Sequence, residues 1–184
     1  MSMNLLRKKW FAQVVMVLCI LTGTLLGSYR SLTSAKAAVE KQFYEGVDHD
    51  GFSIQHDLEE RINLAHNLIT IAGKYQVDGN KVYQARQALQ EASTISQKYA
   101  ANVALSETTH ELYRALKDQS MEPKDEDYRE RINADLLSRN STISHDGYNA
   151  KAATLNQTFR QFPANVLRGL LRITEAELFY QGKE

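Results

Sequence analysis

The sequence predicts an all-α protein, with a single N-terminal transmembrane helix followed by an elongated antiparallel bundle of three to four long helices. Apolar residues recur at helical spacing through most of the chain, whereas no alternating strand pattern of useful length occurs. Only two prolines and nine glycines are present in 184 residues, so long helices meet few breaks. We divide the chain into a short basic segment (1–9), a transmembrane anchor (10–29) and a helical domain (30–184).

The predicted anchor reads WFAQVVMVLCILTGTLLGSY and contains no charged side chain. A helix of this length extends about 30 Å, the thickness of the hydrocarbon core of a bilayer. Trp10 and Tyr29 stand at its two ends, where aromatic residues are common at membrane interfaces. A cleaved signal peptide is the alternative, but its apolar run is usually only about 7–15 residues long. The Ala-Lys-Ala at residues 35–37 also lies beyond charged Arg30, so we expect an uncleaved anchor.

The distribution of basic residues favours a cytoplasmic N-terminus and a helical domain outside the cytoplasm. Arg7, Lys8 and Lys9 directly precede the span, whereas three more basic residues are spread over residues 30–41. The two sides are equal in number, so only the density of charge gives this orientation. We therefore expect a single-pass protein of the cell membrane.

Charge and cysteine content exclude several kinds of site. Beyond residue 9 the chain has 19 of its 22 basic residues against all 22 acidic residues, which gives little support for nucleic-acid binding. Cys19 is the single cysteine, so neither an internal disulfide nor a thiolate zinc site is available.

Glycines and prolines mark the ends of the predicted helices. The helices 80–118 and 124–162 would each have about 39 residues and extend roughly 58 Å, and their short connection favours an antiparallel pair. With 52–75 they form a three-helix core, which a flanking fourth helix can close. Gly147 costs about 1 kcal/mol relative to alanine in a helix, so we expect a kink or break near 144–147. Periodicity predicts helices near 30–44, 52–75, 80–118, 124–162 and 164–180.

No residue pattern points to a metal, a cofactor or a catalytic site. The Asp-His-Asp triplet at residues 48–50 is more typical of a solvated turn, because three neighbouring residues rarely converge on one ion. His56 and His66 are ten residues apart, about 80° from sharing one side of a helix, and lack the spacing of a zinc-binding pair. We expect no cofactor and no enzymatic activity. An enzyme with a hidden site built from His66, Asp57 and Glu60 is the least favoured alternative.

Three stretches resemble a known family. Arg61 precedes LAHNLITIAGKY, VYQARQAL lies on a predicted long helix, and YNAKAATLNQTFRQFP comes near the end of the chain. From about residue 43 to residue 179 the chain resembles the LemA family of bacterial membrane-anchored proteins. The resemblance implies an anchor and a helical bundle, with no established catalytic residues. Ala65-His66 and residues 144–147 depart from the family pattern, so we interpret the chain as a divergent member. The matching positions are Arg61, Asn67, Ala85, Arg86, Tyr148, Asn149, Asn156, Phe162 and Pro163.

The last stretch predicts a helix with a buried seam of the coiled-coil type. Its apolar residues follow at steps of four, three, four and three, and they are Tyr148, Ala152, Leu155, Phe159 and Phe162. Asn149 and Asn156 lie beside this seam, one heptad apart. We interpret them as register residues that hydrogen-bond to a neighbouring helix or its loop, and Pro163 as the end of the pattern.

These observations favour a membrane-anchored scaffold or interaction protein of the bacterial cell envelope. It would contact lipid through residues 10–29 and a protein partner through the helical domain. The alternative is a ligand-sensing or signal-input module that acts through a membrane partner, because anchored bundles can shift helices when a ligand binds.

Overall fold

A computed structural model describes residues 9–46 and 52–180. Within these ranges all regular secondary structure is helical and no strand occurs, which confirms the predicted fold class. The expectations for Arg7, Lys8 and the triplet 48–50 fall outside the described residues. The described chain divides into an anchor unit, residues 9–39 and 154–176, and a bundle unit, residues 40–153 and 177–180.

Helix α1 (Lys9–Glu45) joins the predicted anchor and the helix predicted near 30–44 into one continuous helix. It is long and apolar enough to cross a membrane, and every side chain from residue 12 to residue 24 is exposed. The helix ends where Gly46 takes a φ of 85° and donates its N–H to the carbonyl of Gln42. Glycine accepts this left-handed conformation without a Cβ clash, so it terminates the helix.

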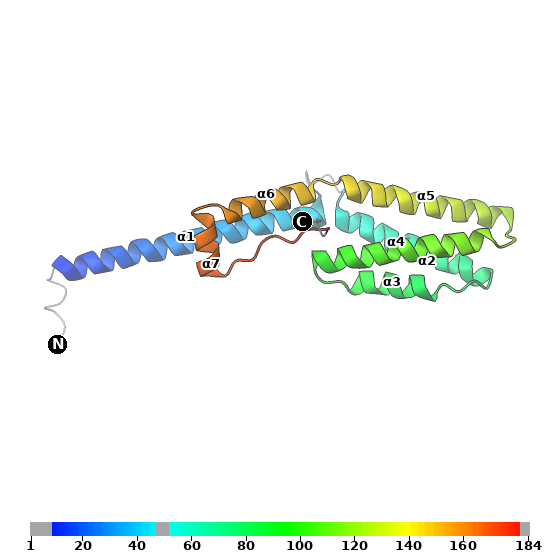
Figure 1. The fold of residues 1–184 in the computed structure, drawn as a ribbon, viewed down its shortest axis with the longest axis horizontal. Helices are drawn as coiled ribbons and strands as arrows, with labels where there is room; N and C mark the ends of the chain where they lie inside the picture. Colours follow the sequence, from blue (N-terminus) through cyan, green and yellow to red (C-terminus); the bar gives the residue numbers. More distant parts are fainter. Residues whose placement is uncertain (1–8, 47–51, 181–184) are drawn as a thin grey trace. The chain divides into compact units, whose positions relative to one another are not determined.

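Four helices of the bundle unit run alternately up and down, as Figure 1 shows. They are α2 (Ile54–Lys74), α3 (Asn80–Glu91), α4 (Ile95–Lys117) and α5 (Pro123–His145). Helix α2 buries side chains on more than one side, including Leu58, Ala65, Leu68 and Ile71. It therefore packs against α3, α4 and α5 at once, as its wide apolar stripe indicates.

The single helix predicted over 80–118 is wrong, because the chain reverses direction between α3 and α4. Ala92 is extended, and Thr94 is the N-cap of α4. The Thr94 side chain accepts the Gln97 N–H, while the Gln97 side chain accepts the Thr94 N–H, which forms a capping box. Helix α3 consequently folds back on α4, and α5 packs chiefly against α2 rather than against a 39-residue partner.

The break expected near 144–147 is confirmed. Helix α5 ends at His145, and α6 (Tyr148–Arg160) begins after Asp146 accepts the Tyr148 N–H at 2.7 Å. Such an aspartate satisfies one of the free N–H groups at a helix start.

The helix predicted over 164–180 is mostly wrong, since α7 (Ala164–Leu171) stops after eight residues. Arg172 has a φ of 55°, and the N–H groups of Arg172 and Ile173 donate back to the last turn. Residues 173–178 then follow without helix. The sequence pattern was misleading because Ile173, Ala176 and Phe179 are buried at three-residue intervals, close to a helical repeat.

Candidate functional site

Arg61 lies inside the bundle unit and is only 2 % exposed. Its guanidinium donates to the Leu136 carbonyl on α5 at 3.1 Å and to the Ser106 hydroxyl on α4 at 2.6 Å. Burial lowers the pKa of Arg61 to about 10, while nearby Asp57 opposes the shift. The side chain therefore stays charged at neutral pH and ties α2 to both neighbouring helices.

Arg86 makes a similar connection from α3, because its Nε donates to the Ile62 carbonyl on α2 at 3.1 Å. A helical carbonyl has a second lone pair besides the one used within its own helix, so such a bond need not break the helix. Ala85 is buried beside it at 8 % exposure. The half-buried Asn67 side chain makes no hydrogen bond to another described residue.

Tyr148 and Asn149, at the start of α6, bind the main chain of the C-terminal segment in the bundle unit. The fully buried Tyr148 donates its hydroxyl to the Glu177 carbonyl at 2.5 Å. Burial raises the pKa of this hydroxyl above its usual range, and the carboxylates of Glu40 and Glu177 add to the shift, so the donor stays protonated. Asn149 Oδ1 accepts the Phe179 N–H at 2.8 Å.

Asn156 makes a double hydrogen bond in the anchor unit. Its Nδ2 donates to the Ala176 carbonyl at 2.9 Å, and its Oδ1 accepts the Ala176 N–H at 2.8 Å. The side chain is 6 % exposed, so both bonds are shielded from water. Of the two expected kinds of partner, a neighbouring helix or its loop, both asparagines thus bind a non-helical segment of the chain.

Phe162 does not belong to the buried seam, and that expectation is wrong. Tyr148, Ala152 and Phe159 are nearly inaccessible, but Phe162 is 83 % exposed. The helical repeat stops applying because α6 ends at Arg160, and Pro163 is the N-cap of α7.

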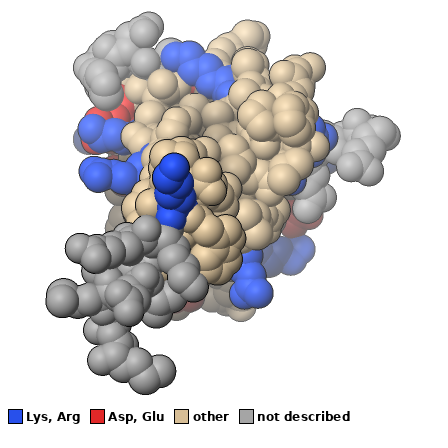
Figure 2. All heavy atoms as spheres, turned by 90° about the vertical axis from the view of Figure 1, so that its left-hand side faces the viewer, with Lys and Arg blue, Asp and Glu red and all other residues tan. Residues whose placement is uncertain are grey.

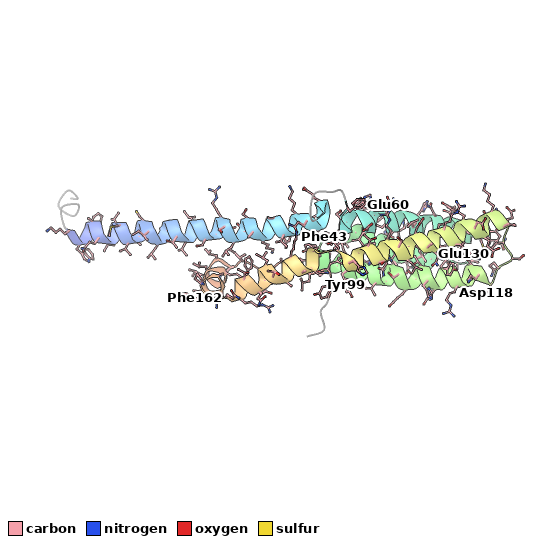
Figure 3. The ribbon with its side chains drawn as sticks, turned by 90° about the horizontal axis from the view of Figure 1, so that it is seen from above. Phe43, Glu60, Tyr99, Asp118, Glu130 and Phe162 are labelled. Carbon is pink, nitrogen blue, oxygen red and sulfur yellow. The ribbon has the colours of Figure 1, made fainter. Side chains whose placement is uncertain are left out.

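A groove lies between α4 and α5 in the bundle unit, with a cavity of about 650 Å³. Its apolar wall includes Val103, Ile143 and Phe179. At one end the rings of Tyr99 and Phe179 meet edge to face with centroids 5.5 Å apart, and Phe43 packs on Phe179 at 5.5 Å. Figure 3 places the labelled Phe43 and Tyr99 at this end of the bundle unit, away from Asp118. We call this feature the α4–α5 groove.

The polar side chains of the groove are neutral or acidic. Glu107 and Asp146 line the cavity, and among the described residues no lysine or arginine lines it. Asn102 also lines the cavity and is 4 % exposed, and its buried Oδ1 has no hydrogen-bond partner in the described part of the chain. A buried acceptor without a donor costs about 1–3 kcal/mol, so a ligand N–H or ammonium group at Asn102 would be stabilised. The groove suits an apolar ligand that carries hydrogen-bond donors or positive charge.

Arg61 lies next to the base of this groove. Ser106 lines the cavity, donates to the Asn102 carbonyl at 2.9 Å and accepts the bond from Arg61. A second, smaller cavity of about 50 Å³ is lined by Arg61, Ser106 and Asn140. The arginine of the family motif therefore supports the floor of the groove and does not enter the larger cavity.

The residues of the hypothetical enzyme site are not gathered. Asp57 is buried and accepts from Arg139 at 2.9 Å, whereas His66 is exposed. Nine residues of helix separate Asp57 from His66, which puts them about 180° apart around α2. No group of three or more His, Cys, Asp or Glu side chains in the described ranges is arranged to hold a metal ion.

Sequence reasoning missed the groove, although one signal for it was present. Helix α4 buries Ile95, Asn102, Thr109 and Leu116 at intervals of seven residues. An asparagine at such a core position is unusual and marks either a polar contact or a binding site.

The fold and these hydrogen bonds define an all-α protein. Buried polar side chains link the helices of its bundle, and its N-terminal helix can cross a membrane. Comparison with protein families matches the LemA family over residues 52–184. The chain therefore belongs to the LemA family, which confirms the resemblance found in its sequence. No curated protein and no solved structure matches the chain.

Proposed function

We propose that this LemA family protein is held in the bacterial cell membrane by α1 and serves as an interaction module of the cell envelope. Its N-terminus would lie in the cytoplasm and its helical domain outside. The α4–α5 groove is the binding surface for a protein partner. The single observation that carries this function is the buried Asn102 Oδ1, which has no donor among the described residues although Asn102 lines a groove of apolar, neutral polar and acidic side chains.

The chemistry of the groove selects the kind of partner. Val103 and Ile143 favour aliphatic or aromatic side chains, because burying them removes apolar surface from water. Glu107 and Asp146 favour lysine or arginine, and they would repel an acidic segment. The proposed partner segment is accordingly apolar and basic, with a main-chain or side-chain N–H placed at Asn102.

A photo-crosslinking amino acid at Val103 is expected to link the full chain in native membranes to one protein partner. The matched control carries the same group at Tyr128, which is 44 % exposed on α5 and does not line the cavity. Ile143→Arg adds a cation to the acidic groove and should abolish the Val103 adduct, since it competes with the basic partner.

Adducts of the same size from Val103 and Tyr128, or a Val103 adduct that survives Ile143→Arg, would contradict a groove-bound protein partner.

The sensing alternative has its own support, because about 650 Å³ lies within the range of small-molecule pockets. It predicts no Val103 protein adduct but a rise in melting temperature with small apolar amines, lost in Asn102→Leu.

The proposed orientation is tested by labelling intact cells with a membrane-impermeant maleimide. Tyr83→Cys places a thiol on the exposed face of α3, where Tyr83 is 51 % exposed, and we expect it to react from outside. The unchanged chain has only Cys19, which the bilayer would shield, so it serves as the control. Labelling of the Tyr83→Cys variant only after the membrane is opened would reverse the orientation.

A further inference from the structure

The anchor unit exposes an apolar ridge that its own helices leave uncovered. Phe162 is 83 % exposed, Val166 58 % and Leu170 65 %, and they follow one another at intervals of four residues. Val166 and Leu170 are therefore one turn apart on the same side of α7. Leu167 and Leu171 are half-buried, so α7 turns a second apolar side towards its own unit.

Helix α7 lies beside α1 where the covered part of α1 begins. Side chains from 12 to 24 are all exposed, whereas Leu25, Ser28 and Leu32 are half-buried at helical spacing. In Figures 1 and 3, α6 runs antiparallel to α1, and α7 follows at the end of α6 that is nearer to the start of α1. The expected membrane span is residues 10–29, so the side chains of α1 begin to be half-buried within the last turns of this span.

Arginines flank the ridge. Glu175 accepts from Arg160 at 2.9 Å and from Arg168 at 3.0 Å, while the exposed Arg172 makes no ion pair with another described residue. The three arginines outnumber the single glutamate, so these side chains carry an excess of positive charge. Figure 2 looks from the side at which α1 begins, and that face is mainly uncharged with more blue than red. An apolar ridge edged by arginines matches the boundary between acyl chains and phosphate headgroups.

We propose that Phe162, Val166 and Leu170 insert into the lipid–water interface on the side where α1 leaves the membrane. The inference rests on the proposed anchoring of α1. A lipid bilayer is the partner, because the ridge adjoins the helix that would hold it at the bilayer surface. Arg172 then lies at the level of the phosphate groups, and α7 forms a second membrane contact of the anchor unit.

Single-tryptophan variants of the full chain test this contact. Trp10 is the single native tryptophan, so Trp10→Phe combined with Phe162→Trp reports on the ridge alone. We use nanodiscs of phosphatidylcholine and phosphatidylglycerol with bromines on the acyl chains close to the headgroup. The expected result is quenching of the tryptophan at position 162 by the brominated lipid and its protection from aqueous iodide. The matched control is Gln157→Trp in the Trp10→Phe background, an exposed site on α6 that iodide alone should quench.

Native Trp10 reports on the anchor separately from the ridge. If brominated lipid quenches Trp10 but quenches position 162 no more than position 157, the ridge does not enter the interface. The anchoring of α1 in the bilayer is then still supported. If Trp10 also escapes quenching, both the anchoring and the ridge contact are overturned. Leu170→Trp in the Trp10→Phe background provides a second reporter, and it should match Phe162→Trp in depth if the ridge inserts as a whole.

Discussion

Arg61→Ala is expected to lower the free energy of unfolding by about 3 kcal/mol, through the combined loss of two hydrogen bonds and creation of a cavity. Arg61 is almost fully buried and joins α2 to Leu136 on α5 and to Ser106 on α4. For a chain of this size the melting temperature should fall by roughly 6–12 °C. The measurement is thermal unfolding of the full chain in detergent, followed by helical circular dichroism.

Two further variants separate the role of charge from that of volume. Arg61→Met keeps an apolar side chain of similar length, and the loss should be clearly smaller, because replacing a buried charge by a hydrophobic residue also removes its desolvation cost. Arg131→Ala removes an exposed arginine on α5 and should change the melting temperature little. Equal effects of Arg61→Ala and Arg131→Ala would show that the buried arginine does not hold the helices together.

Asn156→Leu is expected to release the C-terminal segment of the anchor unit. The substitution removes both hydrogen bonds to Ala176 and leaves the N–H and carbonyl of a residue with 4 % exposure without these partners. The expected cost is about 2–4 kcal/mol in local stability, equivalent to roughly 30- to 700-fold faster amide exchange. Hydrogen–deuterium exchange of a peptide containing residues 173–180 measures this change.

Gln157→Leu is the matched control, because Gln157 is the exposed neighbour of Asn156 on α6. It adds the same side chain without removing these bonds and should leave exchange of the segment unchanged. Asn149→Leu should have a smaller effect than Asn156→Leu, since the Asn149 side chain accepts one hydrogen bond from the main chain of this segment, whereas the Asn156 side chain makes two. Unchanged exchange in Asn156→Leu would mean that packing alone retains the segment.

Local sequence signals explain which helix ends were predicted correctly. Gly147 and the polar residues before it marked the break between α5 and α6, and an aspartate at position 146 caps the new helix. The capping box at Thr94 and Gln97 was equally local, but the apolar repeat continues on both sides of it and masked the turn. Phe162 was misplaced for the same reason, because a repeat carries no information about where the helix stops.

The path of the C-terminal segment could not be predicted from the sequence, because it depends on tertiary contacts. Asn149 and Asn156 are seven residues apart on α6, an advance of about 10.5 Å. Their partners, Phe179 and Ala176, are three residues apart, and an extended chain covers about 10 Å over that distance. The heptad spacing of the asparagines therefore suits a non-helical stretch of main chain, although in the sequence it was typical of helix packing.

The sequence by itself determined the helical class, the apolar length of α1 and the family, because these follow from local periodicity, composition and short motifs. Only the tertiary structure decided that Arg61 supports a groove between α4 and α5 and that Asn102 lines that groove with no donor for its Oδ1 among the described residues. It also decided that α7 turns one of its two apolar sides outward. The physical reason is that a hydrophobic pattern specifies which side of a helix avoids water. It does not specify which neighbour covers that side, or where the neighbours leave a gap.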